Sequence, residues 1–175
     1  MRSLRILLLG AFLMLLSNTV SAQKWGIRAG VNISDINADG WDSSSKTGLY
    51  AGIYKEIPLV KSLLFIQPEV QYSQEGFSTD IDDVKIDYLT VPILAKVYVA
   101  KLLSFETGPQ FGFLVNDNVD YTDPNSFVPS WAFGTSLNLP LGLSINARYI
   151  TGVDDTFDSL SGKNQVFQVG AAFQF

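Results

Sequence analysis

Hydrophobic and polar residues alternate along most of the chain. In the stretch KWGIRAGVNI, residues 24–33, one face carries Trp25, Ile27, Ala29, Val31 and Ile33, while the other carries glycine, arginine and asparagine. A period of two is that of a half-buried β-strand. The same period returns in seven further segments, near residues 47–56, 62–74, 85–99, 102–115, 130–138, 142–151 and 164–175. The pattern therefore predicts eight β-strands.

The connections between these segments alternate in length. Long connections, near residues 34–46, 75–84, 116–129 and 152–163, are interleaved with short ones near residues 57–61, 100–101 and 139–141. Outer-membrane barrels combine an even number of antiparallel strands with short periplasmic turns and longer external loops. Most segments have close to the length that a tilted strand needs to cross a membrane, which is about nine to eleven residues. We therefore predict an all-β protein, an eight-stranded antiparallel transmembrane β-barrel with both termini in the periplasm.

The first residues have the features of a secretory signal peptide. Arg2 and Arg5 precede the apolar run Ile6–Leu16, and residues 20–22, Val-Ser-Ala, form a small-residue cleavage pattern. The apolar run is shorter than the about twenty residues of a membrane-spanning helix. We expect a cleaved signal peptide at residues 1–22, followed by the barrel domain at residues 23–175.

Composition excludes most enzyme chemistries. The chain contains neither His nor Cys, so it lacks the usual general base, Ser–His pairs, thiol nucleophiles and zinc sites built on those residues. Without Cys there is no disulfide framework and no lipoprotein anchor. The formal net charge of −5 gives no basic footprint for nucleic acid. We predict a protein that is not an enzyme and that uses no cofactor and no nucleic-acid partner.

Charged residues occur on the polar face of the alternating segments. This lumen charge network consists of Arg28, Glu69, Lys96, Glu106 and Arg148, and the pattern leaves the face of Glu56 open. In a polar lumen these charges would pair across the barrel, as buried charges must. Glu69 and Glu106 could instead form an acid–base pair, but the cations on the same face favour ion pairs. A soluble ligand-binding barrel is the alternative architecture, and the polar inward face and the loop pattern favour the membrane barrel.

Aromatic residues support the same architecture. Phe173 and Phe175 finish the last segment, and such an ending is similar to the signal that the insertion machinery reads in bacterial outer-membrane proteins. Aromatics near predicted strand ends are candidates for interfacial girdles: Trp25, Tyr72, Tyr121, Trp131 and Tyr149. Others on the presumed inner face would fill an interior that eight strands leave only wide enough for side chains: Tyr50, Tyr54, Phe65, Tyr88 and Tyr98.

Three prolines lie inside predicted strands. Pro68, Pro92 and Pro109 each remove a donor from the strand ladder, and a closed barrel has no edge on which to place them. We therefore expect bulges or kinks at these positions. Counting from the intervening turns places the three at similar heights on adjacent strands.

The long connections are acidic. They hold thirteen of the seventeen acidic residues, whereas Lys24, Lys55, Lys61 and Lys101 gather at the other end. Possible aromatic anchors for a partner in these connections are Trp41, Phe77, Tyr121, Phe127 and Phe157, although each could equally pack its own loop.

One long connection begins like a calcium-binding loop. Asp35, Asn37 and Asp39 occupy alternate positions before Gly40, but the twelfth position holds Lys46 in place of the bidentate Glu. Calcium loops of this type also lie between helices, whereas both flanks here alternate like strands. We predict no metal site, and expect only weak collective attraction of divalent cations to the acidic end.

The central segments resemble a known family. FIQPEVQYSQEG (65–76), YLTVPILAKVYV (88–99) and ETGPQFGFLV (106–115), with GIRAGVNIS (26–34), look like the PorT-like, or porin-like, bacterial outer-membrane β-barrel proteins. The resemblance covers nearly the whole chain after residue 22. It implies a barrel of OmpA/OmpX-type size in the outer membrane, and some members of the family are associated with protein secretion across that membrane.

These patterns lead to two functional hypotheses. The first is a monomeric outer-membrane scaffold with a filled, charged lumen, which presents four acidic external loops to an envelope or secretion protein and contacts outer-membrane lipid. The alternative is a narrow, low-conductance pore for ions or small solutes, because ions could pass along the charged lumen.

Overall fold

The computed structural model describes residues 24–38, 44–78, 83–99, 102–117, 126–153 and 162–175, and only the backbone of the strand residues next to the gaps. The strands are β1 (Lys24–Ala38), β2 (Ser44–Val60), β3 (Leu64–Ser78), β4 (Asp83–Val99), β5 (Leu103–Asp117), β6 (Phe127–Asn138), β7 (Leu143–Gly152) and β8 (Gly162–Gln174). A short 3₁₀ turn, η1 (Pro140–Gly142), joins β6 to β7. Within the described residues, no helix has the length and apolarity needed for a membrane span.

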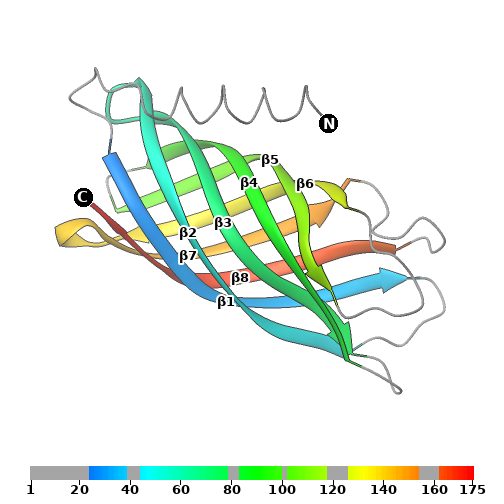
Figure 1. Ribbon diagram of the computed structural model, residues 1–175. Coiled ribbons are helices and arrows are strands. Elements are labelled where there is room, and N and C mark those ends of the chain that lie inside the picture. The colour runs from blue at the N-terminus through cyan, green and yellow to red at the C-terminus, as the bar shows by residue number, and fades with distance from the viewer. Residues whose placement is uncertain (1–23, 39–43, 79–82, 100–101, 118–125, 154–161) are drawn as a thin grey trace.

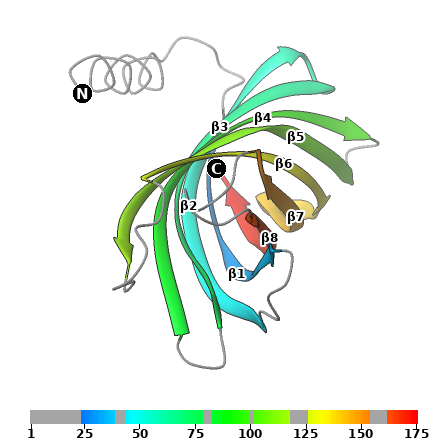
Figure 2. The same cartoon turned by 90° about the vertical axis from the view of Figure 1, so that its right-hand side faces the viewer.

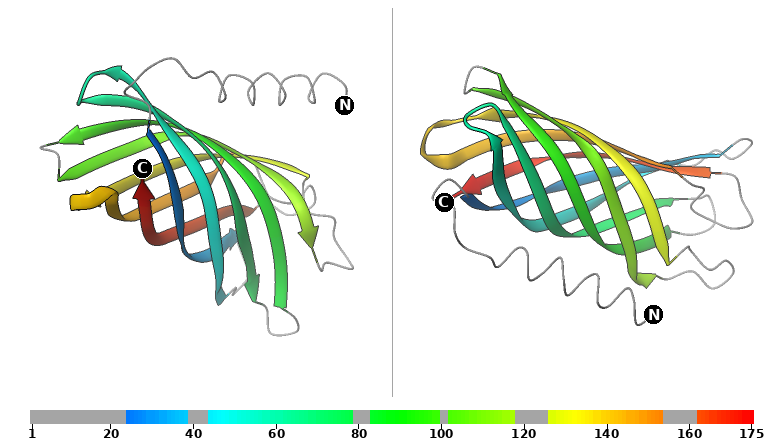
Figure 3. Two further views of the ribbon diagram at one scale, coloured as in Figure 1. Left: turned by 60° about the vertical axis from the view of Figure 1, so that its left-hand side comes forward. Right: turned by 90° about the horizontal axis from the view of Figure 1, so that it is seen from above.

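The eight strands form one closed antiparallel barrel, which confirms the predicted fold class. Each strand pairs with its neighbours in the chain, and β1 closes the barrel against β8, with Gly26 opposite Gln174 and Gly30 opposite Gly170. The strands tilt strongly around the barrel axis (Figures 1 and 2). The short connections gather at one end, here called the short-turn end, and the strand ends far from them lie at the other, here called the long-loop end (Figure 3).

The outer face of the barrel wall is apolar and the inner face is polar, which is the reverse of the usual arrangement in a soluble protein. Large apolar side chains are exposed on the outside, among them Ile27, Leu49, Ile53, Phe133 and Ile145, each at least half exposed. Charged and amide side chains are buried inside. An apolar exterior around a polar interior is the arrangement of a barrel that is surrounded by lipid.

The strands extend further toward the long-loop end than the alternating pattern predicted. The first connection was expected near 34–46, but β1 continues to Ala38 and β2 begins at Ser44. Similarly, β3 reaches Ser78 and β4 begins at Asp83. Apolar alternation is required only where the outer face contacts lipid, whereas backbone pairing can continue beyond it with polar side chains. The sequence pattern therefore marks the lipid-facing part of each strand and not its full length.

The three prolines cause no register shift, so the expected bulges are absent there, whereas kinks at these positions stay a prediction. Pro68 lies opposite Ile93 and Pro92 opposite Gln110, so the prolines do lie at similar heights. Pairing is interrupted beside Pro68 between β3 and β4, and beside Pro92 and Pro109 between β4 and β5, and it then resumes in the same register. On its other side, Pro109 lies in an unbroken ladder opposite Trp131. The register shifts instead between Ser45 and Tyr50, between Pro58 and Val60, and at Asp87. A missing donor breaks one hydrogen bond without requiring an extra residue, which is why the register is kept.

Candidate functional site

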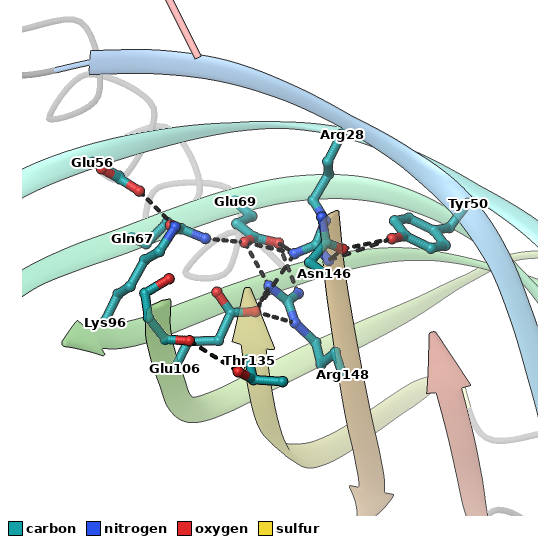
Figure 4. Close-up of polar contacts among 11 residues, drawn as sticks. Arg28, Tyr50, Glu56, Gln67, Glu69, Lys96, Glu106, Thr135, Asn146 and Arg148 are labelled. Atoms are coloured by element: carbon teal, nitrogen blue, oxygen red, sulfur yellow. Dashed lines mark hydrogen bonds and ion pairs between the residues drawn. The ribbon is translucent and has the colours of Figure 1, made fainter. Parts of the chain in front are cut away.

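Four charged side chains meet across the middle of the lumen. Arg28, Glu69, Glu106 and Arg148 come from β1, β3, β5 and β7, that is, from every second strand (Figure 4). We call these four residues the ion cluster. Strand register brings two of them together, because Gly134 in β6 lies opposite both Glu106 and Arg148. A Cβ at Gly134 would approach the Glu106 carboxylate to 2.7 Å, so a glycine at this position leaves the room that the carboxylate occupies.

Arg148 is the centre of the ion cluster and is fully buried. Its Nη1 and Nη2 donate to the two oxygens of Glu69 at 2.9 and 2.8 Å. Its Nε and Nη2 donate to Oε1 of Glu106 at 2.8 and 2.5 Å. The planar guanidinium thus binds one carboxylate with two parallel hydrogen bonds, the strong geometry for such pairs. One side chain links three strands across the lumen.

Arg28 completes the charge balance. Its Nη1 lies 3.1 Å from Oε1 of Glu69 and 3.8 Å from Oε1 of Glu106, and its Nη2 donates to Oδ1 of Asn146 at 2.7 Å. Two cations and two carboxylates make the cluster formally neutral. Neutral pairing with several hydrogen bonds is the condition under which charges are tolerated in a buried setting.

Tyr50 lies beside the ion cluster, where it contacts Arg28 and packs over two glycines of the barrel wall. The guanidinium of Arg28 lies 5.3 Å from the centre of the Tyr50 ring, and the Tyr50 hydroxyl donates to Oδ1 of Asn146 at 3.1 Å. A Cβ at Gly170 would collide with the Tyr50 hydroxyl and with the backbone oxygen of Ala29. Tyr50 therefore fills space that two paired glycines, Gly30 and Gly170, leave open in the wall.

Lys96 does not join the ion cluster through an ion pair. The sequence grouped it with the other four, but its Nζ donates to Oε1 of Glu56 at 2.8 Å. The hydroxyl of Tyr98 donates to the same oxygen at 2.8 Å. Glu56, whose face the alternation left open, is buried and points inward. The lumen thus holds two charge groups, with the Lys96–Glu56 pair nearer the short-turn end (Figure 4).

The other side of the ion cluster is rich in amides and hydroxyls. Gln71, Gln110 and Gln168 are buried, and five of their side-chain polar atoms make no hydrogen bond to any group that the structure describes. A small space of about 10 Å³, beside Gln110 and Thr90, has room for about one water. Buried amides are normally hydrogen-bonded to protein or water, so this half of the lumen is suited to hydration.

Glu75 was expected in an external acidic loop, and the structure places it elsewhere. It lies in β3 with 7% of its surface exposed, and Ser73 donates to its Oε1 at 2.9 Å. Glu75 follows Glu69, Gln71 and Ser73 at a spacing of two, so the period of the strand could have identified it as inward-facing. The acidic composition of the following residues concealed that signal.

The candidate loop contacts divide into two groups. Trp41, Tyr121 and Phe157 lie outside the described residues. Phe77 and Phe127 belong to strands and not to loops, since β3 extends to Ser78 and β6 begins at Phe127. Phe127 packs against Phe111 and Phe113 on the outer wall, with ring centres 6.1 and 5.5 Å apart.

The arrangement offers little for acid–base or metal chemistry. Both carboxylates of the ion cluster accept hydrogen bonds from Arg148, so neither has the separate environment that distinguishes an acid from a base. Among the described residues, no group of three or more carboxylates could hold a metal ion. Within the Asp35–Lys46 segment, β1 ends at Ala38 and β2 begins at Ser44, while residues 39–43 and the side chains of the whole segment lie outside the description.

Comparison with known proteins gives one family and several similar structures. The pattern of the family described as outer membrane protein beta-barrel domain matches residues 19–158. Ail, the attachment invasion locus protein of Yersinia pestis, is 15% identical with a TM-score of 0.59, over 87% of this chain and 98% of that one. Neisserial surface protein A is 11% identical with a TM-score of 0.59, over 86% and 97%.

OprG from Pseudomonas aeruginosa is 12% identical with a TM-score of 0.50, over 88% of this chain and 96% of that one. At such identities the likeness concerns the fold alone. No curated protein sequence matches the chain significantly.

Proposed function

The chain belongs to the outer membrane protein beta-barrel family, and from this premise we propose that it is a non-enzymatic scaffold, closed through its lumen, that presents its long loops to partners outside the cell. In this proposal both termini lie in the periplasm, residues 1–22 are a removed signal peptide, and the protein belongs with the PorT-like members of the family. The short-turn end then faces the periplasm, as in other barrels of this class.

The observation that carries this proposal is the position of Arg148. Its guanidinium lies in the middle of an eight-stranded lumen, buried and bonded to carboxylates on two other strands. An interior of this size is just wide enough for side chains to fill. A solute passing through would have to separate these pairs, and breaking a buried pair costs about 3–5 kcal/mol.

Strand length supports an interaction role for the long-loop end. Strands β1–β5 contain 15 to 17 residues, whereas about nine to eleven are enough to cross the membrane. The additional residues would hold the loops above the lipid on a stiff frame, which is where binding residues are commonly placed.

Charge indicates what kind of partner these loops would bind. A structure of Ail in complex with sucrose octasulfate, a heparin analogue, also resembles the present barrel, with a TM-score of 0.59. The long connections of the present chain carry most of its acidic residues, so they would repel such a polyanion. We therefore expect a basic partner surface, because complementary charge guides association and suppresses wrong partners.

Binding of the protein in lipid nanodiscs to polylysine-coated and heparin-coated surfaces tests this role. We expect retention on polylysine and none on heparin. Changing Asp120, Asp123, Asp154 and Asp155 to Asn should weaken polylysine binding about tenfold, while Ser43→Ala, Ser44→Ala and Ser45→Ala should leave it unchanged. Equal binding of the aspartate variant and the serine variant to polylysine, or retention of the protein on heparin, would contradict the proposed role of the loops.

A narrow pore is the second candidate, and one observation favours it. Spaces lie on both sides of the ion cluster, an open cavity at the short-turn end and a small polar space beside Gln110. If the cluster opened, these two spaces would join into one path through the lumen. Single-channel conductance separates this candidate from the scaffold, because only a pore carries a steady current through the wild-type barrel.

A further inference from the structure

An open cavity of about 600 Å³ lies at the short-turn end of the barrel. Its walls come from β1–β4, from the η1 turn, and from β6–β8. This volume is within the about 300–1,000 Å³ that is typical of small-molecule sites. The ion cluster is not part of its lining, so the cavity is distinct from the site described above.

The inner part of this cavity is aromatic and without net charge. Tyr54, Phe65 and Tyr98 line it, with the rings of Phe65 and Tyr98 edge to face at 5.2 Å. The charge of Lys96 at this depth is neutralised by Glu56 at 2.8 Å. The inner wall therefore offers a surface for an apolar group and leaves no charge to be matched.

The mouth of the cavity is positively charged. Lys24 and Lys61 line it and are exposed. Neither ammonium forms a salt bridge with a residue in the described part of the chain. Glu56, the strand partner of Lys24, is already bonded to Lys96 and Tyr98. Two cations that have no carboxylate partner among the described residues thus lie in front of an aromatic interior.

We propose that this cavity binds a small monocarboxylate with an apolar body. The carboxylate lies at the mouth between Lys24 and Lys61, and the body packs against Phe65 and Tyr98. The reverse orientation would place the carboxylate beside Glu56 and the apolar body in water. Binding does not require an open lumen or a loop partner, so the proposal stands independently of the scaffold role.

Calorimetric titration of the protein in phosphatidylcholine nanodiscs with 2-naphthoate tests this site. The neutral 2-naphthamide has the same body without the charge and reports partition into lipid. The variant that carries both Lys24→Gln and Lys61→Gln removes the mouth charges. Its matched control carries Lys85→Gln and Lys163→Gln, which remove the same charge near the opposite strand ends. Ser144→Trp places a bulky side chain in the cavity.

We expect one naphthoate site per wild-type barrel and about tenfold weaker binding to the Lys24 and Lys61 variant, as two partly exposed ion pairs would give. The control variant should bind like wild type, 2-naphthamide should bind no more than lipid alone, and Ser144→Trp should abolish the site. Equal affinity of wild type and the Lys24 and Lys61 variant would overturn the proposal, as would a naphthamide signal equal to that of naphthoate. Because the lysines are exposed, that variant keeps the test decisive even if Ser144→Trp fails to fold.

Discussion

At the scale of single residues, the barrel interior depends on matched polar groups and on the glycines that make room for them. Arg148 binds two carboxylates, and Arg28 supplies the second cation that balances them. Neither arginine has an alternative partner in bulk water, because both are buried. The stability of the ion cluster is therefore collective, and removing one member leaves the others unmatched.

Replacing Arg148 should destabilise the protein strongly. Arg148→Gln leaves Glu69 and Glu106 with a single facing arginine, and we expect the free energy of unfolding to fall by about 3–5 kcal/mol. Arg148→Lys keeps the charge without the planar fork and should lose less. The measurement is urea-induced unfolding from lipid vesicles, in a double-mutant cycle with Glu69→Gln. Additive effects of the two substitutions would show that the pair is not coupled.

Gly170 should be sensitive to the smallest substitution. In Gly170→Ala the new methyl group would meet the backbone oxygen of Ala29 and the Tyr50 hydroxyl, so we expect a loss of about 1–3 kcal/mol. Gly112→Ala is the control, because its methyl would come no closer than 3.3 Å to the backbone oxygen of Val128. That change should alter stability by less than about 1 kcal/mol. Similar losses for both would show that the Tyr50 niche has no special role.

At the scale of elements, the sequence predicted which segments form strands but not where they end. Alternation identified all eight because every lumen-facing residue has a lipid-facing neighbour. It missed the long-loop ends, such as Asp35–Ala38, where the strands continue to pair although the polar and acidic residues there are typical of a loop. It also missed the partner of Lys96. Register places Lys96 opposite Glu106, but Glu106 accepts hydrogen bonds from Arg148, and the ammonium of Lys96 instead binds Glu56 on β2.

The turn between β6 and β7 contains a residue in an unfavourable conformation. Leu141 has a φ of 65° and is 88% exposed, and a branched side chain in the left-handed region costs about 1–3 kcal/mol. Leu141→Asn should therefore raise the free energy of unfolding by about 1 kcal/mol, since Asn adopts this region more readily. Leu143→Asn is the control, because Leu143 has an ordinary extended φ of −80°. The same unfolding measurement applies, and equal effects of the two substitutions would contradict the argument.

At the scale of the whole molecule, the barrel separates an apolar exterior from a polar interior, and the polar interior is divided by the ion cluster. An open cavity lies on the short-turn side, with two unpaired lysines among the described residues, and an amide-rich chamber lies on the other. The sequence indicated the charged lumen because charges recur on one face of the strands. It could not indicate the division, which depends on distances across the barrel between residues up to 118 positions apart.

Single-channel conductance of the protein in a planar lipid bilayer tests the central claim most directly. If the ion cluster closes the lumen, wild-type protein inserts without a steady current. Arg148→Gln or Glu69→Gln then introduces a current, because each substitution breaks the cluster. Gly112→Ala, which lies outside the cluster, should remain silent. A steady, ion-selective current through the wild-type barrel that Arg148→Gln or Glu69→Gln alters would contradict the account and identify the protein as a narrow pore.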